Sequence, residues 1–219
     1  MVNQVSVGEL QTNCWIISLP QTDREASGGE CILVDPGGDG NVILGRLKQL
    51  LLKPRYIVLT HAHFDHLAAL PELAAAYPAA AVAVHPAETA KLGPHSLEPH
   101  RRDFNSAAGG AASVYVEALW KPLPEASLLL NEGDTLGPFT TLHLPGHSPG
   151  SIGLLWEEEK ILISGDTLFN AGVGRTDLPG GDQKELNRSL ARLFTLDGDT
   201  TVYPGHGPVT TIRRERGRS

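Results

Sequence analysis

The sequence has 219 residues, of which 41% are hydrophobic and 20% charged, and this is enough apolar material for one domain spanning residues 1–219. The same apolar and charged fractions argue against a disordered chain. A net charge of −7, with only three Trp, four Tyr and five Phe, argues against nucleic-acid or anionic-lipid partners. The start of the chain lacks the basic and apolar regions of a signal peptide, and no apolar run reaches the roughly 18 residues of a membrane span, so we expect a cytoplasmic protein without a membrane partner.

The first part of the chain predicts β-strands joined by turns. Short apolar stretches at residues 14–17 and 31–34 are separated by a polar run at residues 21–30. Cys14 and Cys31 stand inside these apolar stretches, where we expect small buried thiols and no disulfide.

The middle of the chain alternates between the two periodicities. Apolar residues at helical spacing predict helices over residues 41–52 and 67–76, the second ended by Pro78, and compact apolar runs predict strands over residues 56–59 and 81–85. Residues 93–124 follow no regular pattern, and we assign no structure to them.

The last part of the chain returns to strands. Short apolar runs predict strands at residues 127–130, 139–144, 152–156, 160–164 and 201–203. Asp182 offers an N-cap for a helix that ends at Phe194. The order of elements indicates two halves of similar make-up, packed sheet against sheet with helices outside.

One segment carries most of the chemical information: Thr60-His61-Ala62-His63-Phe64-Asp65-His66, where a predicted strand gives way to a helix. On the composition of this chain, the His-x-His-x-Asp-His spacing is expected by chance on the order of 10⁻³ times. His61 and His63 project to one side of an extended backbone and can reach one metal ion, whereas Asp65 and His66 can face a second. The structural alternative for Asp65 is a helix cap.

Three more candidate ligands, His147, Asp166 and His206, each follow a predicted strand beside glycine or proline. Imidazole and carboxylate ligands without thiolate suit zinc, iron or manganese, and seven ligands suit two ions. Each of the three taken alone is better explained by a turn or capping role, but together with the His-x-His-x-Asp-His segment they favour metal binding. The remaining candidates lack the glycine-framed setting and are treated as ordinary histidines: His85, His95, His100 and His143.

These motifs, together with Thr12-Asn-Cys-Trp15 and Asp35-Pro-Gly37, resemble the metallo-β-lactamase superfamily and, within it, the glyoxalase II-like hydrolases. The stretch Gly174-Arg-Thr-Asp-Leu-Pro-Gly-Gly181 resembles the shorter, single-domain bacterial members. The resemblance implies an α/β (α+β) fold, namely a four-layer αβ/βα sandwich whose strand-end loops hold a dinuclear centre.

The resemblance also implies a role for each ligand. His61, His63 and His147 would hold one divalent ion, Asp65, His66 and His206 the other, and Asp166 would bridge them. Zinc is the expected metal, with iron or manganese as alternatives. Two such ions turn a bridging water into hydroxide near neutral pH, and Asp65 would be the catalytic residue that orients it.

The implied activity is hydrolysis of a small acyl thioester, S-lactoylglutathione or another hydroxyacylglutathione. The chain ends soon after His206, so we expect no additional C-terminal glutathione-binding helical domain. The family's glutathione-contacting lysine and tyrosine fall on Arg175 and Asp177. Arg175 is therefore expected to bind a substrate carboxylate, or alternatively to brace its loop through an ion pair with Asp177 or Asp182.

Other functions stay open at this point. Persulfide dioxygenases share these motifs but use one iron, which His61, His147 and Asp166 would hold here. The continuation Leu178-Pro-Gly-Gly-Asp182 favours the hydrolases. Lactone hydrolysis and non-catalytic metal binding are further alternatives, whereas an antibiotic-degrading β-lactamase is disfavoured by the bridging Asp166. The expected partner is a small molecule, and the oligomeric state is not predicted.

Overall fold

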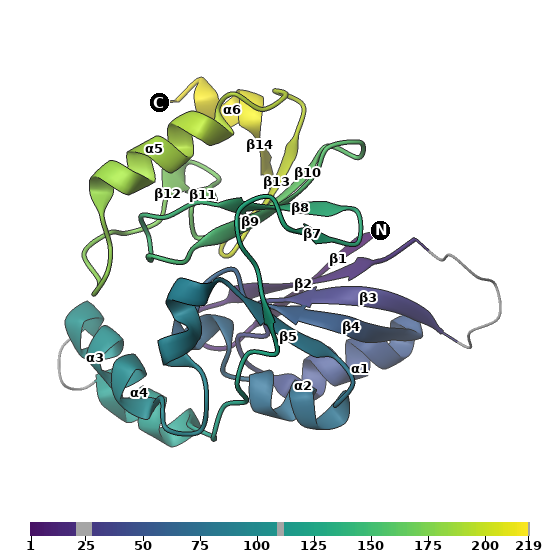
Figure 1. The fold of residues 1–219 in the computed structure, drawn as a ribbon, viewed down its shortest axis with the longest axis vertical. Helices are drawn as coiled ribbons and strands as arrows, with labels where there is room; N and C mark the ends of the chain where they lie inside the picture. Colours follow the sequence, from purple (N-terminus) through teal and green to yellow (C-terminus); the bar gives the residue numbers. More distant parts are fainter. Residues whose placement is uncertain (21–27, 109–111, 219) are drawn as a thin grey trace.

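Two six-stranded β-sheets stacked face to face form the centre of the molecule (Figure 1). The computed structural model describes residues 1–20, 28–108 and 112–218. The first sheet has the order β1-β2-β3-β4-β5-β6, with parallel pairing from β3 onward. Its strands are β1 (Val2–Val7), β2 (Thr12–Ser18), β3 (Gly29–Val34), β4 (Leu52–Val58), β5 (Ala81–Val84) and β6 (Leu128–Leu129).

The second sheet is built from the later part of the chain in the order β14-β13-β10-β9-β8-β7. Its strands are β7 (Thr135–Leu136), β8 (Phe139–His143), β9 (Ile152–Trp156), β10 (Ile161–Gly165), β13 (Thr201–Pro204) and β14 (Thr210–Thr211). A separate hairpin pairs β11 (Leu168–Phe169) with β12 (Gly172–Val173). Strands β8, β10 and β13 run in the same direction, so their carboxyl ends meet at one edge.

Helices cover the outer faces of both sheets (Figure 1). Helices α1 (Gly40–Leu50) and α2 (Leu70–Ala76) lie against the first sheet, and α5 (Gln183–Leu193) and α6 (Ile212–Arg216) lie against the second. The resulting order of layers is the four-layer αβ/βα sandwich expected from the sequence, and that prediction is confirmed. No helix among the described residues is long and apolar enough to cross a membrane.

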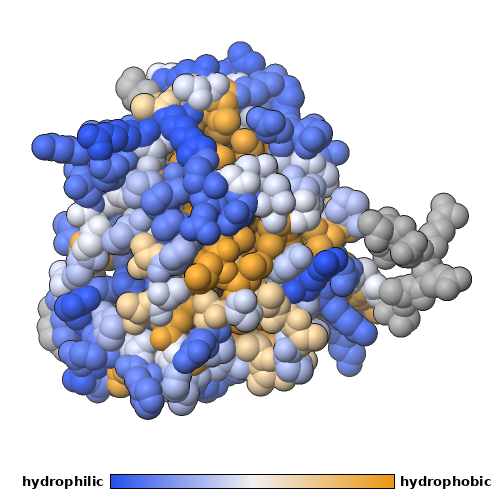
Figure 2. Space-filling view, viewed as in Figure 1, coloured by the Kyte–Doolittle hydropathy of each residue, from blue (hydrophilic) through white to orange (hydrophobic). Residues whose placement is uncertain are grey.

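Strand β2 shows how alternation builds two cores at once. Cys14 and Ile16 pack into the cluster beneath α1 and α2, whereas Trp15 and Ile17 pack into the cluster between the sheets. All four side chains are buried, and each large apolar one contributes about 1.5–3 kcal/mol by leaving water. Figure 2 shows a mainly hydrophilic face with apolar atoms gathered where the two halves meet.

The two cysteines behave as the sequence predicted. Cys14 and Cys31 are both buried and carry free thiols. Burial raises the pKa of the Cys31 thiol to about 12, and burial likewise raises the pKa of Cys14 well above its ordinary value. Thiols held in this protonated form are poor nucleophiles and poor metal ligands.

Two parts of the sequence-based prediction differ from the structure. The helix expected to start at residue 67 starts at Leu70, after the 3₁₀ turn η1 (Phe64–His66), because Pro71 has no N–H and fits only in a first turn. The unassigned segment contains α3 (Leu97–Ala108) and α4 (Ala112–Leu119), which follow the 3₁₀ helix η2 (Pro86–Lys91). Most of the polar turn expected at residues 21–30 lies outside the described residues.

Candidate metal centre

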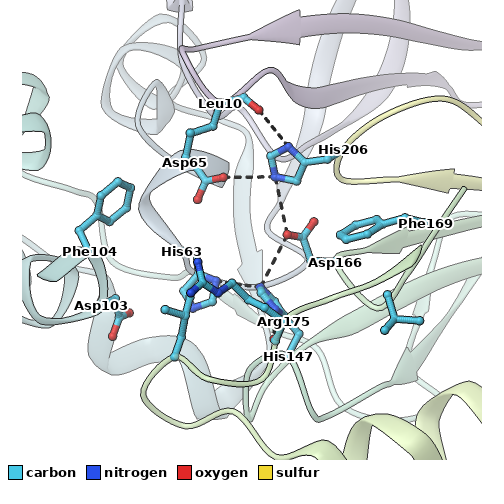
Figure 3. Close-up of a pocket in the computed structure, with 12 residues that line it drawn as sticks. Leu10, His63, Asp65, Asp103, Phe104, His147, Asp166, Phe169, Arg175 and His206 are labelled. Atoms are coloured by element: carbon cyan, nitrogen blue, oxygen red, sulfur yellow. Dashed lines mark hydrogen bonds and ion pairs between the residues drawn. The ribbon is translucent and has the colours of Figure 1, made fainter. Parts of the chain in front are cut away.

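The seven candidate ligands come from loops at the carboxyl ends of strands. His61 and His63 follow β4, Asp65 and His66 belong to η1, and the loops after β8, β10 and β13 supply the rest: His147, Asp166 and His206. Because these strand ends face one edge of the sandwich, the loops converge there (Figure 3).

The first group of ligand atoms is formed by three histidines. Nitrogen atoms of His61, His63 and His147 all lie within 4.8 Å of one another, and all three residues are buried. His63 Nδ1 and His147 Nε2 are 2.9 Å apart. His61 Nε2 is buried without a hydrogen-bond partner, which is costly unless a cation occupies the space that it faces. The donor set therefore fits a metal ion.

The second group contains one carboxylate and two histidines. Asp65 Oδ2 lies 3.3 Å from His206 Nε2 and 3.6 Å from His66 Nε2, and the two Nε2 atoms are 3.3 Å apart. The three atoms surround one point, as the ligands of a second ion would.

Asp166 stands between the two groups. Its Oδ2 is 3.6 Å from both His147 Nε2 and His206 Nε2, and its Oδ1 is 3.5 Å from His66 Nε2. The carboxylate therefore faces both groups at once, which is the geometry of a bridge. A Cβ atom at Gly205 would lie only 2.1 Å from Asp166 Oδ1, so this close approach requires glycine.

Backbone carbonyls fix the orientation of two of the rings. His147 Nδ1 donates a hydrogen bond of 2.7 Å to the carbonyl oxygen of Arg175, and His206 Nδ1 donates one of 3.1 Å to that of Leu10. Because a carbonyl only accepts, each neutral ring keeps its lone pair on Nε2, the atom that faces the other ligands.

Asp35 orients two more rings from behind, a role that could not be predicted from the sequence. Its Oδ2 accepts hydrogen bonds from His66 Nδ1 at 3.0 Å and from Thr60 Oγ1 at 2.7 Å, and Thr60 Oγ1 in turn lies 3.1 Å from His61 Nδ1. The motif Asp35-Pro-Gly37 was visible, but only the fold shows which side chains the carboxylate reaches. Asp35 is fully buried.

Glu88 is a second residue whose role was not predicted from the sequence. It joins two of the loops that carry candidate ligands. Its carboxylate, 1% exposed, accepts hydrogen bonds from the Ala62 N–H at 3.2 Å, from Ser148 Oγ at 2.7 Å and from the Gly150 N–H at 2.8 Å. Ala62 lies between His61 and His63, and Ser148 follows His147. Glu88 therefore ties together the loops that carry the three-histidine group.

The electrostatics of the centre favour a cation. Burial, reinforced by neighbouring imidazoles, lowers the pKa of His61 and of His63, which keeps both rings neutral and able to bind metal. Burial also opposes a charge on His66, but the carboxylates of Asp166, Asp65 and Asp35 outweigh it and raise the pKa of His66 well above its ordinary value. The carboxylates thus favour positive charge between them.

Arg175 lines a cavity beside the candidate ligands, and its guanidinium is already paired. Its Nε and one terminal nitrogen donate to the two carboxylate oxygens of Asp177 at 2.6 Å and 2.7 Å. The alternative partner Asp182 instead caps α5 by accepting from the N–H groups of Lys184 and Glu185. The side chain thus braces its loop through Asp177, and its carbonyl orients His147.

A profile of the metallo-beta-lactamase superfamily matches residues 7–206. The chain belongs to this superfamily. It is 37% identical to "Probable metallo-hydrolase YqgX" of Bacillus subtilis, over 97% of this chain and 93% of that protein. It is 32% identical to "Hydroxyacylglutathione hydrolase GloC" of Haemophilus influenzae, over 97% of this chain and 93% of that protein. The chain is accordingly a metal-dependent hydrolase of this superfamily.

Solved structures of the superfamily share the fold over nearly the whole chain. A structure named BLEG-1 B3 metallo-beta-lactamase superposes with a TM-score of 0.80 at 34% identity, covering 99% of this chain and 97% of that one. TTHA1623, in a di-iron-bound form, superposes with a TM-score of 0.79 at 37% identity, covering 98% of this chain and 96% of that one. ETHE1 from Myxococcus xanthus superposes with a TM-score of 0.72 at 26% identity, covering 99% of this chain and 81% of that one.

Proposed function

We propose that this chain hydrolyses small acyl thioesters, with S-lactoylglutathione as the reference substrate, at a centre of two divalent ions. The observation that carries the proposal is the position of Asp166, which faces two separate groups of ligand atoms. The hydrolase name of the Haemophilus relative and the two iron ions of TTHA1623 support it. Zinc is the metal we expect, with iron or manganese as alternatives.

Each ligand has a place in the proposed centre. His61, His63 and His147 would hold one ion, Asp65, His66 and His206 would hold the other, and Asp166 would bridge them. When bound, two such ions lower the pKa of a water molecule toward neutrality and polarise a carbonyl oxygen.

Asp65 is the residue we assign to orient the attacking water. Burial opposes its ionisation, but His66 and His206 hold the pKa of this carboxyl below its ordinary value, so it is ionised at neutral pH. Figure 3 shows one of its oxygens directed at His206 and the other pointing away from that ring. An ionised carboxylate in this position accepts a hydrogen bond from water and fixes its orientation.

The reaction itself needs no nucleophile from the protein. The water oxygen forms a bond to the acyl carbon, the carbon–sulfur bond breaks, and the thiolate leaves with the electron pair. One proton of the water passes to the thiolate, and the products are a carboxylic acid and a thiol. The buried, protonated Cys14 and Cys31 take no part in this chemistry.

The experiment that tests this function is anaerobic turnover of S-lactoylglutathione, followed by the release of free thiol. Thiol release without oxygen is the expected result. Turnover only in the presence of oxygen and glutathione persulfide would overturn the proposal. It would favour a persulfide dioxygenase whose single iron would be held by His61, His147 and Asp166. Hydrolysis of a β-lactam in preference to every thioester would also overturn it.

A further inference from the structure

Apolar side chains from five segments wall the cavity beside the candidate centre. The cavity has a volume of about 470 Å³ and is lined by Leu10, Phe104, Phe169, Val173 and Leu178. Figure 3 shows Phe104 and Phe169 on opposite sides of Asp65 and Asp166. The phenyl rings thus flank the place where the scissile bond must lie.

Two of these apolar residues are unusually exposed. Leu10 is 51% and Val173 43% exposed, although both are large hydrophobic residues. Exposed apolar side chains at the mouth of a cavity are typical of a ligand-binding surface, because a ligand that covers them removes them from water.

Apart from the candidate metal ligands, the charged side chains around the cavity do not favour an anionic substrate arm. Among the described residues that line it, Arg175 is the single Lys or Arg, and two donors of its guanidinium are used by Asp177. Asp103 also lines the cavity, and its carboxylate pairs with Lys91 Nζ at 2.7 Å. Glutathione carries two carboxylates, whose recognition usually requires cationic side chains that are not already paired with a carboxylate.

We infer that this cavity selects thioesters whose thiol arm is uncharged and apolar, and that Asp177 keeps Arg175 from binding the carboxylates of glutathione. The inference rests on the proposed thioester hydrolysis and narrows its substrate class. The reaction is the same hydrolysis, and only the part of the substrate remote from the scissile bond differs. S-lactoylglutathione is then a substrate with a high KM.

The test uses two matched pairs of lactoyl thioesters. S-lactoylglutathione is compared with its diethyl ester, which keeps the leaving thiol and removes both carboxylate charges. Lactoyl-N-acetylcysteamine is compared with lactoyl-N-hexanoylcysteamine, which adds four methylenes far from the sulfur. We expect kcat/KM to rise at least 10-fold in each pair, because a fully buried methylene is worth about 4-fold.

Two variants test the role of the Arg175–Asp177 pair. Asp177→Asn frees the guanidinium and is expected to lower the KM of S-lactoylglutathione about 10-fold relative to that of the cysteamine thioesters. Arg175→Ala removes the brace of the loop whose carbonyl orients His147, so it is expected to change KM by the same factor, within about 2-fold, for S-lactoylglutathione and for the cysteamine thioesters. Val173→Ser is expected to reduce the gain from the hexanoyl chain.

One combination of results would contradict the inferred substrate class. A preference for S-lactoylglutathione over its diethyl ester, with a KM that Arg175→Ala raises about 10-fold for S-lactoylglutathione but not for the cysteamine thioesters, would make Arg175 a carboxylate clamp and overturn the inference. If no thioester is hydrolysed, the proposed function fails, and calorimetric binding of two stable thioethers decides the inference. S-methyl-N-hexanoylcysteamine should then bind at least 10-fold more tightly than S-methylglutathione, and equal or reversed affinities would overturn it.

Discussion

Asp166 is the residue on which a two-ion centre depends most. Its two oxygens lie within 3.6 Å of ligand atoms from both groups. Asp166→Ala is therefore expected to abolish hydrolysis and to reduce bound metal below two ions per chain, measured by elemental analysis. Asp197→Ala, which removes an exposed carboxylate, is the matched control. Normal turnover with two bound ions in Asp166→Ala would contradict the bridging role.

Asp65 belongs to one group only, so its replacement should separate catalysis from metal binding. Asp65→Asn keeps the shape of the side chain but removes the charge that orients water. We expect kcat to fall by about 100-fold or more, as for the loss of a general base, while the three-histidine group keeps its ion. Metal content and kcat measured on the same sample check this. Loss of both ions would show that the role is misassigned.

Glu88 joins two ligand loops but does not face the substrate, so its replacement is expected to affect metal binding and stability. Glu88→Gln replaces one acceptor oxygen with a donor beside the Ala62 or Gly150 N–H, which leaves a buried donor unpaired at a cost of about 1–3 kcal/mol. We expect metal affinity of the three-histidine group to fall by about 10- to 100-fold, as measured for other groups that orient ligands.

Metal titration and thermal unfolding measure the two effects of Glu88→Gln together. The midpoint of thermal unfolding should fall by roughly 2–10 °C, because a loss of 1 kcal/mol in unfolding free energy lowers Tm by about 2–4 °C in a chain of this size. Glu98→Gln is the matched control, because its side chain is 79% exposed on α3. Unchanged metal affinity in Glu88→Gln would show that the ligand loops hold their geometry without this carboxylate.

The elements that the sequence predicted well are those whose signal is local. Strand β2 alternates between two buried faces, and Asp182 caps α5 as expected, through the N–H groups of Lys184 and Glu185. Helices α3 and α4 have no such signal, because Phe104 and Tyr115 are only partly buried. They stack on each other and meet the core through edge-to-face contacts with Phe64.

The same distinction applies to the candidate centre. Its ligands could be predicted because each stands at a strand end in a recognisable turn, and strand ends converge in this type of sheet. Asp35 and Glu88 could not, because their roles depend on contacts with loops 25 to 62 positions away in the chain. The pairing of Arg175 with Asp177 was foreseen only as one of two alternatives.

For the molecule as a whole, metal binding and protonation compete at His66. Three carboxylates raise the pKa of this ring, so it holds a proton at pH values above its usual range. An ion must displace that proton, and the apparent affinity should therefore fall as the pH falls through the raised pKa, by up to about 10-fold per pH unit. Metal titrations between about pH 6 and about pH 9 measure the slope. An affinity independent of pH would contradict this competition.

The number of ions in each chain tests the proposed centre most directly. The quantity to measure is metal per chain by elemental analysis, in protein purified without added metal or chelator. The arrangement of Asp166 between the groups of His61, His63, His147 and of Asp65, His66, His206 predicts two divalent ions per chain. A single iron per chain in fully active enzyme would contradict it.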